Sequence, residues 1–113
     1  MKYELSKMMK TAKEYFNASA TKWDKPMRVA LAQAVAESIK NNVNLSATMN
    51  AMEFGCGTGL ISMRLALMLK SVLAVDMSEN MLAALQEKIT ENQVQNIIPA
   101  IWTWPGGAAA GTV

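Results

Sequence analysis

The sequence predicts an α/β fold with a parallel sheet, because strand and helix patterns alternate from residue 48 onward. Short apolar or β-branched runs occur at 48–54, 71–76 and 96–102. Helical patterns separate them at 58–70 and 78–93. Such alternation joins parallel strands through right-handed crossovers.

The composition is that of one packed domain. The chain has 113 residues, of which 51% are hydrophobic, and its formal net charge is +2. Residues 1–28 carry seven Lys or Arg against three acids, whereas the remainder carries four against six. We interpret the basic segment as a solvated helix face rather than as a site for an anionic partner. No nucleic-acid partner is therefore expected.

Neither a membrane span nor an export signal is evident. No run of 18 or more apolar residues occurs, and the opening stretch "MKYELSKMMK" lacks the apolar centre of a signal peptide. Cys56 is the single cysteine, so no intrachain disulfide can form, which fits a reducing compartment. We expect a cytoplasmic protein. Because the chain has no His, it can build neither a His/Cys metal site nor a Ser-His-Asp triad, so we expect no metal and assign no catalytic residue.

Two helices are predicted ahead of the sheet, at 3–17 and 26–40, because apolar residues recur there at helical spacing. Asp24 is the predicted N-cap of the second helix, and Pro26 suits its first turn. Ser78 is the predicted N-cap of the last helix. Pro99 cannot donate to a strand ladder, so the third strand is expected at a sheet edge.

These patterns divide the chain into three parts. Residues 1–47 form an N-terminal helical segment, residues 48–104 form the sheet-containing core, and residues 105–113 form a loose tail.

Three glycines lie directly between the first strand and its helix: Gly55, Gly57 and Gly59. Glycine permits close backbone approach to a ligand, and the N-terminus of the following helix suits an anion. Asp76 ends the second strand, beside the same crevice, where a carboxylate can accept hydrogen bonds from both hydroxyls of a ribose. The region therefore predicts a ligand site.

The spacing selects among ligands. A dinucleotide site has the pattern G-x-G-x-x-G, whereas here the pattern is G-x-G-x-G and Leu60 stands at the third glycine position. No G-K-[ST] follows, so a phosphate-binding P-loop is excluded.

The stretch "EFGCGTG" resembles the first motif of class I S-adenosylmethionine-dependent methyltransferases, and "VLAVDMSENML" resembles their second. "YFNASATKWDK" is similar to the segment that precedes the core in many small-molecule members of that superfamily. The resemblance covers roughly residues 12–98, and Asp76 lies 21 positions after Gly55, as the two motifs require. It implies a Rossmann-like methyltransferase fold, with S-adenosylmethionine as cofactor and a small molecule as methyl acceptor.

The resemblance also implies roles for single residues. Glu53 would fix the ammonium group of the cofactor, Asp76 would hold its ribose hydroxyls, and Met77 would pack on its adenine. Trp23 would either close over the cofactor or pack between helices. Four residues would lie against the methionine part of the cofactor through their backbone: Gly55, Cys56, Gly57 and Gly59. We interpret Cys56 as a small filler rather than as a nucleophile.

The family's sheet has seven strands, whereas this sequence predicts three. We therefore expect a fold truncated after about the third parallel strand, with two N-terminal helices. The alternatives are a shortened methyltransferase, a fragment completed by a partner, and a half-fold that self-associates along strand 48–54 as a homodimer. Little methyl transfer is expected from this chain alone. A non-catalytic cofactor-binding or interaction module is the second functional hypothesis, and an NAD-binding oxidoreductase is the third.

Overall fold

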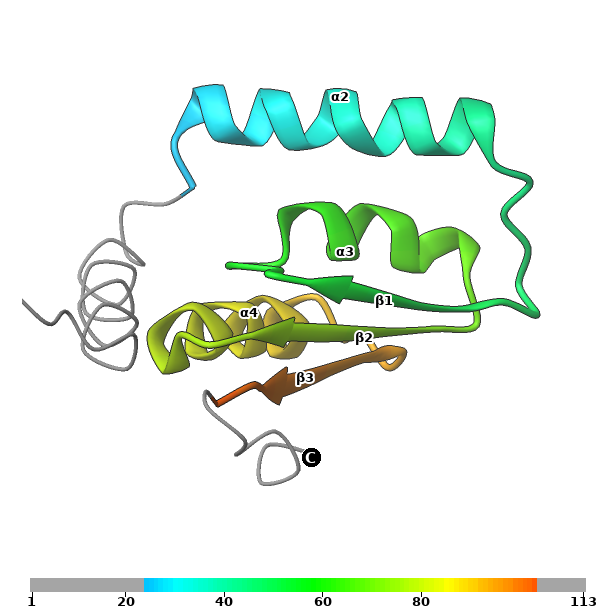
Figure 1. Cartoon of the computed structure of the whole chain (residues 1–113). Coiled ribbons are helices and arrows are strands. Elements are labelled where there is room, and N and C mark those ends of the chain that lie inside the picture. The colour runs from blue at the N-terminus through cyan, green and yellow to red at the C-terminus, as the bar shows by residue number, and fades with distance from the viewer. Residues whose placement is uncertain (1–23, 104–113) are drawn as a thin grey trace, which may run out of the picture.

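The computed structural model describes residues 24–103, in which three parallel strands form a single sheet. The strands are β1 (Asn50–Phe54), β2 (Ser71–Asp76) and β3 (Ile97–Ile101), in the order β1-β2-β3 (Figure 1). The predicted α/β class, the parallel pairing and the position of the Pro99 strand at an edge are confirmed. The predicted helix at 3–17 and Trp23 lie outside the described residues.

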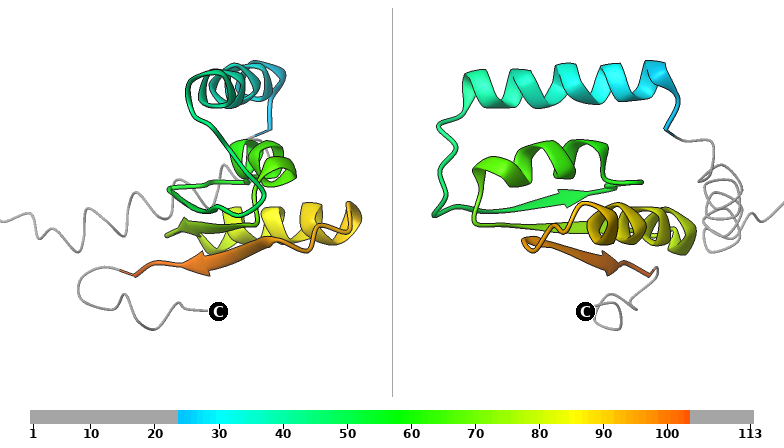
Figure 2. Two further views of the ribbon diagram at one scale, coloured as in Figure 1. Left: turned by 90° about the vertical axis from the view of Figure 1, so that its right-hand side faces the viewer. Right: turned by 180° about the vertical axis from the view of Figure 1, so that it is seen from behind.

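Helices α3 and α4 cover one face of the sheet, and the hydrophobic core lies between these helices and the strands. Helix α3 (Leu60–Leu65) continues into a short 3-10 turn, η2 (Ala66–Met68), and helix α4 (Glu79–Glu91) packs against β2 and β3 (Figure 2). The core is apolar and includes Val72, Ala74, Leu85, Ile89 and Ile97. Burial of one such aliphatic side chain contributes roughly 1.5–3 kcal/mol.

Helix α2 (Pro26–Asn42) lies outside this core and packs on α3. Only Ala32 and Ala36 of α2 are buried, whereas Met27 and Leu31 are largely exposed. No helix between residues 24 and 103 has the length and apolar character that crossing a membrane requires.

Strand β1 begins two residues later than the predicted 48–54. A turn precedes it, in which the Met49 amide donates to the Ser46 carbonyl at 3.1 Å and the hydroxyls of Ser46 and Thr48 lie 2.8 Å apart. The opposite face of the strand stays open, since Met52 and Phe54 are each 65% exposed.

Two predictions about helix ends were tested by the structure. Ser78 caps α4, because its hydroxyl accepts a hydrogen bond from the Met81 amide at 3.2 Å. Asp24 does not cap α2: the N-cap is Lys25, and Pro26 occupies the first turn as predicted. The side chain of Asp24 instead contacts Thr58, 34 residues further along the chain.

Candidate functional site

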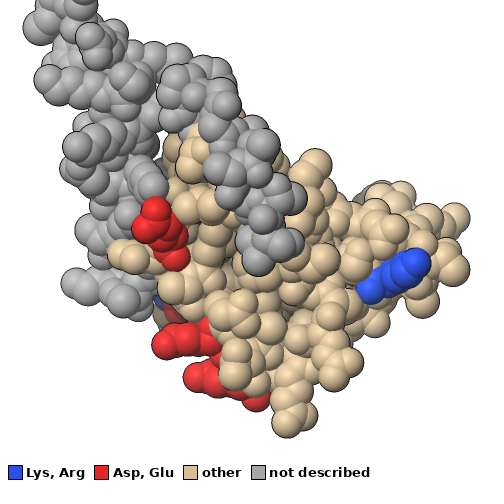
Figure 3. Space-filling view, turned by 90° about the horizontal axis from the view of Figure 1, so that it is seen from below, with Lys and Arg blue, Asp and Glu red and all other residues tan. Residues whose placement is uncertain are grey.

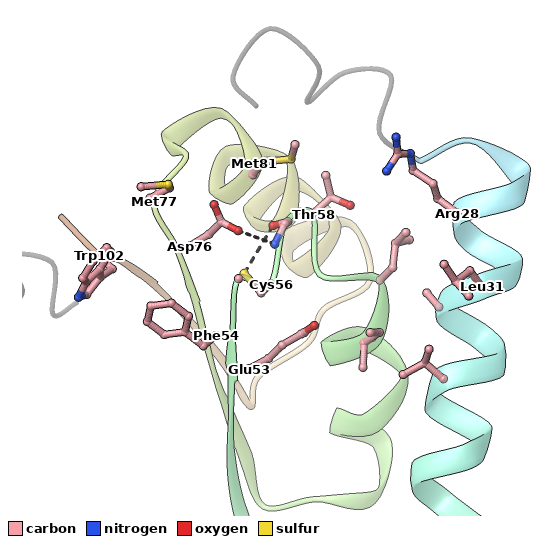
Figure 4. Close-up of a pocket in the computed structure, with 16 residues that line it drawn as sticks. Arg28, Leu31, Glu53, Phe54, Cys56, Thr58, Asp76, Met77, Met81 and Trp102 are labelled. Carbon is pink, nitrogen blue, oxygen red and sulfur yellow. Dashed lines mark hydrogen bonds between the residues drawn. The ribbon is translucent and has the colours of Figure 1, made fainter. Parts of the chain in front are cut away.

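A cavity of about 600 Å³ lies at the carboxyl ends of β1 and β2 (Figure 4). Its floor is the turn between β1 and α3, residues 55–59, which we call the glycine loop. One wall is formed by α2 through Arg28, Leu31, Ala32 and Val35. The sequence did not indicate this wall, because the α2 pattern showed an amphipathic helix without showing what the helix would face.

Positive φ angles shape the glycine loop: +76° at Gly55, +58° at Gly57 and +81° at Gly59. The amides of Gly55 and Cys56 both donate to the Val75 carbonyl, at 2.7 and 2.9 Å, which anchors the loop to β2. Residues other than glycine rarely adopt such backbone angles without strain.

The glycines at the two ends of the loop face different surroundings. A Cβ atom added to Gly55 would meet nothing within 4 Å, so the backbone there is open to the cavity. A Cβ added to Gly59 would lie 2.3 Å from Cδ1 of Leu85 on α4. Gly55 therefore leaves space for a ligand, and Gly59 lets the loop pack on α4. Gly59 is not among the residues that line the cavity.

The carboxylate of Asp76 holds the glycine loop. Its Oδ2 accepts from the Gly57 amide at 2.8 Å, and its Oδ1 accepts from the Ser78 amide at 2.9 Å. Each carboxylate oxygen can accept more than one hydrogen bond, so Asp76 keeps acceptor capacity for a ligand in the cavity that it lines.

Glu53 lines the cavity from β1, and its Oε1 accepts from the Ser62 amide at 3.2 Å and from the Ser62 hydroxyl at 2.5 Å. Burial raises the pKa of Glu53, the two hydrogen bonds from Ser62 oppose that rise, and the charge of Asp76 adds to it. The carboxyl group of Glu53 therefore occupies the position at the start of α3. Two acids, Glu53 and Asp76, make the cavity suited to a cationic group.

Cys56 lines the cavity but is only 6% exposed. Burial, and next the negative charges of Asp76 and Glu53, raise the pKa of its thiol to about 12. A thiol in these surroundings stays protonated at neutral pH, which agrees with the interpretation of Cys56 as a filler rather than a nucleophile.

Two aromatic rings lie at the carboxyl ends of the strands, since Phe54 ends β1 and Trp102 follows β3. Phe54 and Trp102 pack edge to face, with ring centroids 5.6 Å apart and an interplanar angle of 67°. Both line the cavity, together with Met77 and Met81 (Figure 4). Trp102 directly follows β3, and the rule that singled out Asp76, a residue at the carboxyl end of a parallel strand, could also have singled out Trp102.

A partly buried polar cluster lies behind the loop, and the sequence did not indicate it. The Thr58 hydroxyl donates to Asp24 Oδ1 at 2.5 Å, and Lys88 of α4 forms an ion pair with Asp24. The ammonium of Lys88 also donates to the Thr58 carbonyl at 3.1 Å and to the Thr58 hydroxyl at 3.2 Å. No local pattern predicts contacts between residues so distant in sequence.

The structure thus gathers seven of the eight predicted site residues in or beside the loop, and the eighth, Trp23, lies outside the described part of the chain. Within residues 24–103, no group of three or more His, Cys, Asp or Glu side chains could hold a metal ion.

The fold is an α/β domain with a cavity at the carboxyl ends of parallel strands, which is where such sheets bind ligands. Residues 51–102 match the family described as "Methyltransferase domain". Among curated protein sequences, no significant match was found.

Several solved structures have a fold similar to that of the described core. A SAM-dependent methyltransferase from Aquifex aeolicus is 25% identical, with a TM-score of 0.59 over 72% of this chain and 44% of that one. The YcgJ protein from Bacillus subtilis is 15% identical, with a TM-score of 0.60 over 63% and 30%. Phosphoethanolamine N-methyltransferase 1 from Haemonchus contortus, solved with phosphoethanolamine and S-adenosylhomocysteine, is 22% identical, with a TM-score of 0.58 over 80% and 21%.

These matches confirm the resemblance predicted from the motifs. The described core is similar to the N-terminal part of class I S-adenosylmethionine-dependent methyltransferase domains. The chain spans less than half the length of each of these three solved structures.

Proposed function

We propose that this chain binds S-adenosylmethionine in the cavity above the glycine loop and serves methyl transfer to a small molecule. The observation that carries the proposal is the position of Glu53. Its carboxylate lies at the start of α3, where a dinucleotide-binding domain would receive a pyrophosphate. A pyrophosphate would meet a like charge there, whereas the ammonium group of S-adenosylmethionine would meet an opposite one.

The other lining residues fit the same cofactor. Asp76 accepts hydrogen bonds from ribose hydroxyls while it holds the Gly57 amide. Met77 and Trp102 offer apolar surface to the adenine beyond the end of β2. The open space at Gly55 admits the methionine part close to the backbone. When bound, the sulfonium supplies the electrophilic methyl group, so the protein's task is alignment rather than activation.

A small-molecule acceptor fits the described surface better than a nucleic acid does. Within residues 24–103, Arg28 is the only Lys or Arg that lines the cavity, and the wall of α2 beside it is apolar. On the one face that Figure 3 shows, the described surface is largely uncharged, with acidic residues at one side and a basic residue at the other. A phosphate backbone is normally bound by several Lys or Arg side chains. The phosphoethanolamine enzyme named above also acts on a small molecule by its name.

Equilibrium dialysis with S-adenosylmethionine labelled in its methyl group tests the proposal. We expect saturable binding that unlabelled S-adenosylhomocysteine displaces. Binding without methyl transfer to any small acceptor would favour the cofactor-binding module. Absence of binding by a folded chain would contradict the proposed function.

A further inference from the structure

We propose that Lys88 is a positioning residue for the cofactor site, coupling the glycine loop to helix α2 through Asp24. The inference rests on the proposed function and concerns the contacts that position the glycine loop and α2 around the cofactor site. Lys88 lies in α4, outside both motifs, and is not among the residues that line the cavity.

The geometry places Lys88 directly behind the loop. Met81, Leu85 and Lys88 follow one another at spacings of four and three residues, so they share one face of α4. Met81 lines the cavity, and Leu85 contacts Gly59 so closely that a Cβ there would not fit. Lys88 continues this face and reaches the loop at Thr58.

The contacts of Lys88 form a closed set. Its ammonium group has three donors, which meet the Thr58 carbonyl, the Thr58 hydroxyl and the Asp24 carboxylate. The other Asp24 oxygen accepts the proton of the Thr58 hydroxyl. Thr58 is 1% exposed, and the side chains of Lys88 and Asp24 are 24% and 34% exposed. Partial burial makes this ion pair less screened than a surface pair.

The consequence is mechanical. Asp24 lies two residues ahead of α2, and α2 forms a wall of the cavity. Thr58 lies between Gly57, which binds Asp76, and Gly59, which packs on α4. Loss of Lys88 would leave Thr58 buried without its donor and would release the start of α2. The ammonium group of Lys88 therefore supports both the shape of the loop and the position of the wall, in addition to the contacts of the loop with Asp76 and Val75.

The test compares Lys88→Met, Asp24→Asn, their double variant and the control Lys70→Met, in which an exposed lysine receives the same substitution. Calorimetry measures the Kd for S-adenosylhomocysteine. We expect Kd to rise about tenfold for Lys88→Met and about threefold or more for Asp24→Asn, as for loss of hydrogen bonds to a charged group. The double variant should bind about as weakly as Lys88→Met, because the two residues act as one unit. Lys70→Met should stay near wild type.

Amide hydrogen exchange gives a second readout that needs no cofactor. Amides of residues 55–60 and 26–32 should both exchange faster in Lys88→Met and in Asp24→Asn, and at the wild-type rate in Lys70→Met. If Lys88→Met proves unfolded by circular dichroism, Asp24→Asn carries the comparison, since it alters one charge without changing side-chain size.

The proposal would be overturned if Lys88→Met bound S-adenosylhomocysteine with wild-type affinity. It would also be overturned if the rise in Kd of the double variant were the product of the two single rises, or if only one of the two segments exchanged faster. If the wild-type chain binds no S-adenosylhomocysteine, the proposed function fails, and the exchange rates still decide whether Lys88 couples the loop to α2.

Discussion

The carboxylate of Asp76 and the amide of Gly57 are joined by a hydrogen bond of 2.8 Å. The acid that ends the second strand therefore shapes the loop that follows the first strand. Gly57 and Asp76 lie 19 positions apart along the chain, and their hydrogen bond joins the two motifs into one structural unit. A change at Asp76 should consequently affect both the loop and any ligand held above it.

Asp76→Ala should weaken S-adenosylhomocysteine binding by about 1.5–3 kcal/mol, since hydrogen bonds to a partly buried charged acceptor are lost. It should also lower the Tm in the absence of ligand, because the Gly57 amide loses its partner. Asp76→Asn is the matched control: its side-chain oxygen can still accept from that amide. We expect Asp76→Asn to retain more of the ligand-free Tm than Asp76→Ala. Unchanged affinity in both variants would remove Asp76 from the ligand site.

Gly55 and Gly59 should respond differently to the same substitution. Gly59→Ala places a methyl group against Leu85 at a positive φ, so we expect a loss of stability of about 2–4 kcal/mol. Gly55→Ala places it in open space, so the cost should be limited to about 1 kcal/mol of backbone strain. Chemical denaturation of the two variants measures the difference. Equal losses would show that packing on α4 is not what requires glycine at position 59.

Much of the fold could be predicted because local patterns and sheet geometry agree. The β-branched run at 71–76 forms β2 with the predicted bounds, and Ser78 caps α4 as predicted. The helix predicted at 58–70 is shorter, since Gly59 has a left-handed conformation and the chain tightens into a 3-10 turn after Leu65. Helical spacing alone does not show that residues 58 and 59 belong to the glycine loop rather than to the helix.

The site could be predicted in part for the same reason. Residues at the ends of adjacent parallel strands must meet, which places Glu53 near Asp76. The partner of Asp24 could not be predicted. Capping is a local preference, and it was overridden by a tertiary contact with Thr58 and Lys88.

Glu53→Gln should separate the effect of the negative charge of Glu53 on ligand binding from the effect of its side-chain shape. The glutamine oxygen can still accept from Ser62, so the fold should persist. The Tm at neutral pH should rise, because a partly buried charge is removed. Affinity for S-adenosylhomocysteine should fall about tenfold, as expected for loss of a charge-assisted hydrogen bond. Thermal unfolding with and without ligand measures both effects.

The pH dependence provides a check on this residue. Because the pKa of Glu53 is raised, the folded state binds its proton more readily than the unfolded state does. The stability linked to Glu53 is therefore greatest at low pH and is lost as pH rises through the raised pKa. Ligand affinity should change in the opposite direction, falling as pH falls. Glu53→Gln should lack both contributions, and an identical pH profile in this variant would contradict the assignment.

Cys56 should remain unmodified by thiol reagents at neutral pH until the chain is unfolded. Its pKa of about 12 lies above the unfolded value of about 9, so the associated stability is complete below pH 9 and declines as pH rises toward 12. The slope should approach about 1.4 kcal/mol per pH unit at most. Cys56→Ala should lose this slope. Rapid labelling of the native protein would show that the thiol is accessible and ionised.

Assembly along β1 is a further prediction. In the part of the chain that the structure describes, β1 pairs with β2 alone and exposes Met52 and Phe54. Open edges on apolar strands tend to pair with another chain. We therefore predict a homodimer or a complex with a second chain, seen as a doubled or larger mass by light scattering and as slow hydrogen exchange at residues 50–54. Met52→Lys should yield the monomer. A wild-type monomer with rapid exchange there would show that the edge is tolerated.

Calorimetric titration of the wild-type chain with S-adenosylhomocysteine and, separately, with NAD decides which of the two cofactors the cavity binds. The carboxylate of Glu53 at the start of α3 and that of Asp76 beside the glycine loop predict saturable binding of S-adenosylhomocysteine at one site per chain and none of NAD. Saturable binding of NAD without binding of S-adenosylhomocysteine would show that the loop accepts a pyrophosphate despite Glu53. It would contradict the proposal that the cavity binds S-adenosylmethionine.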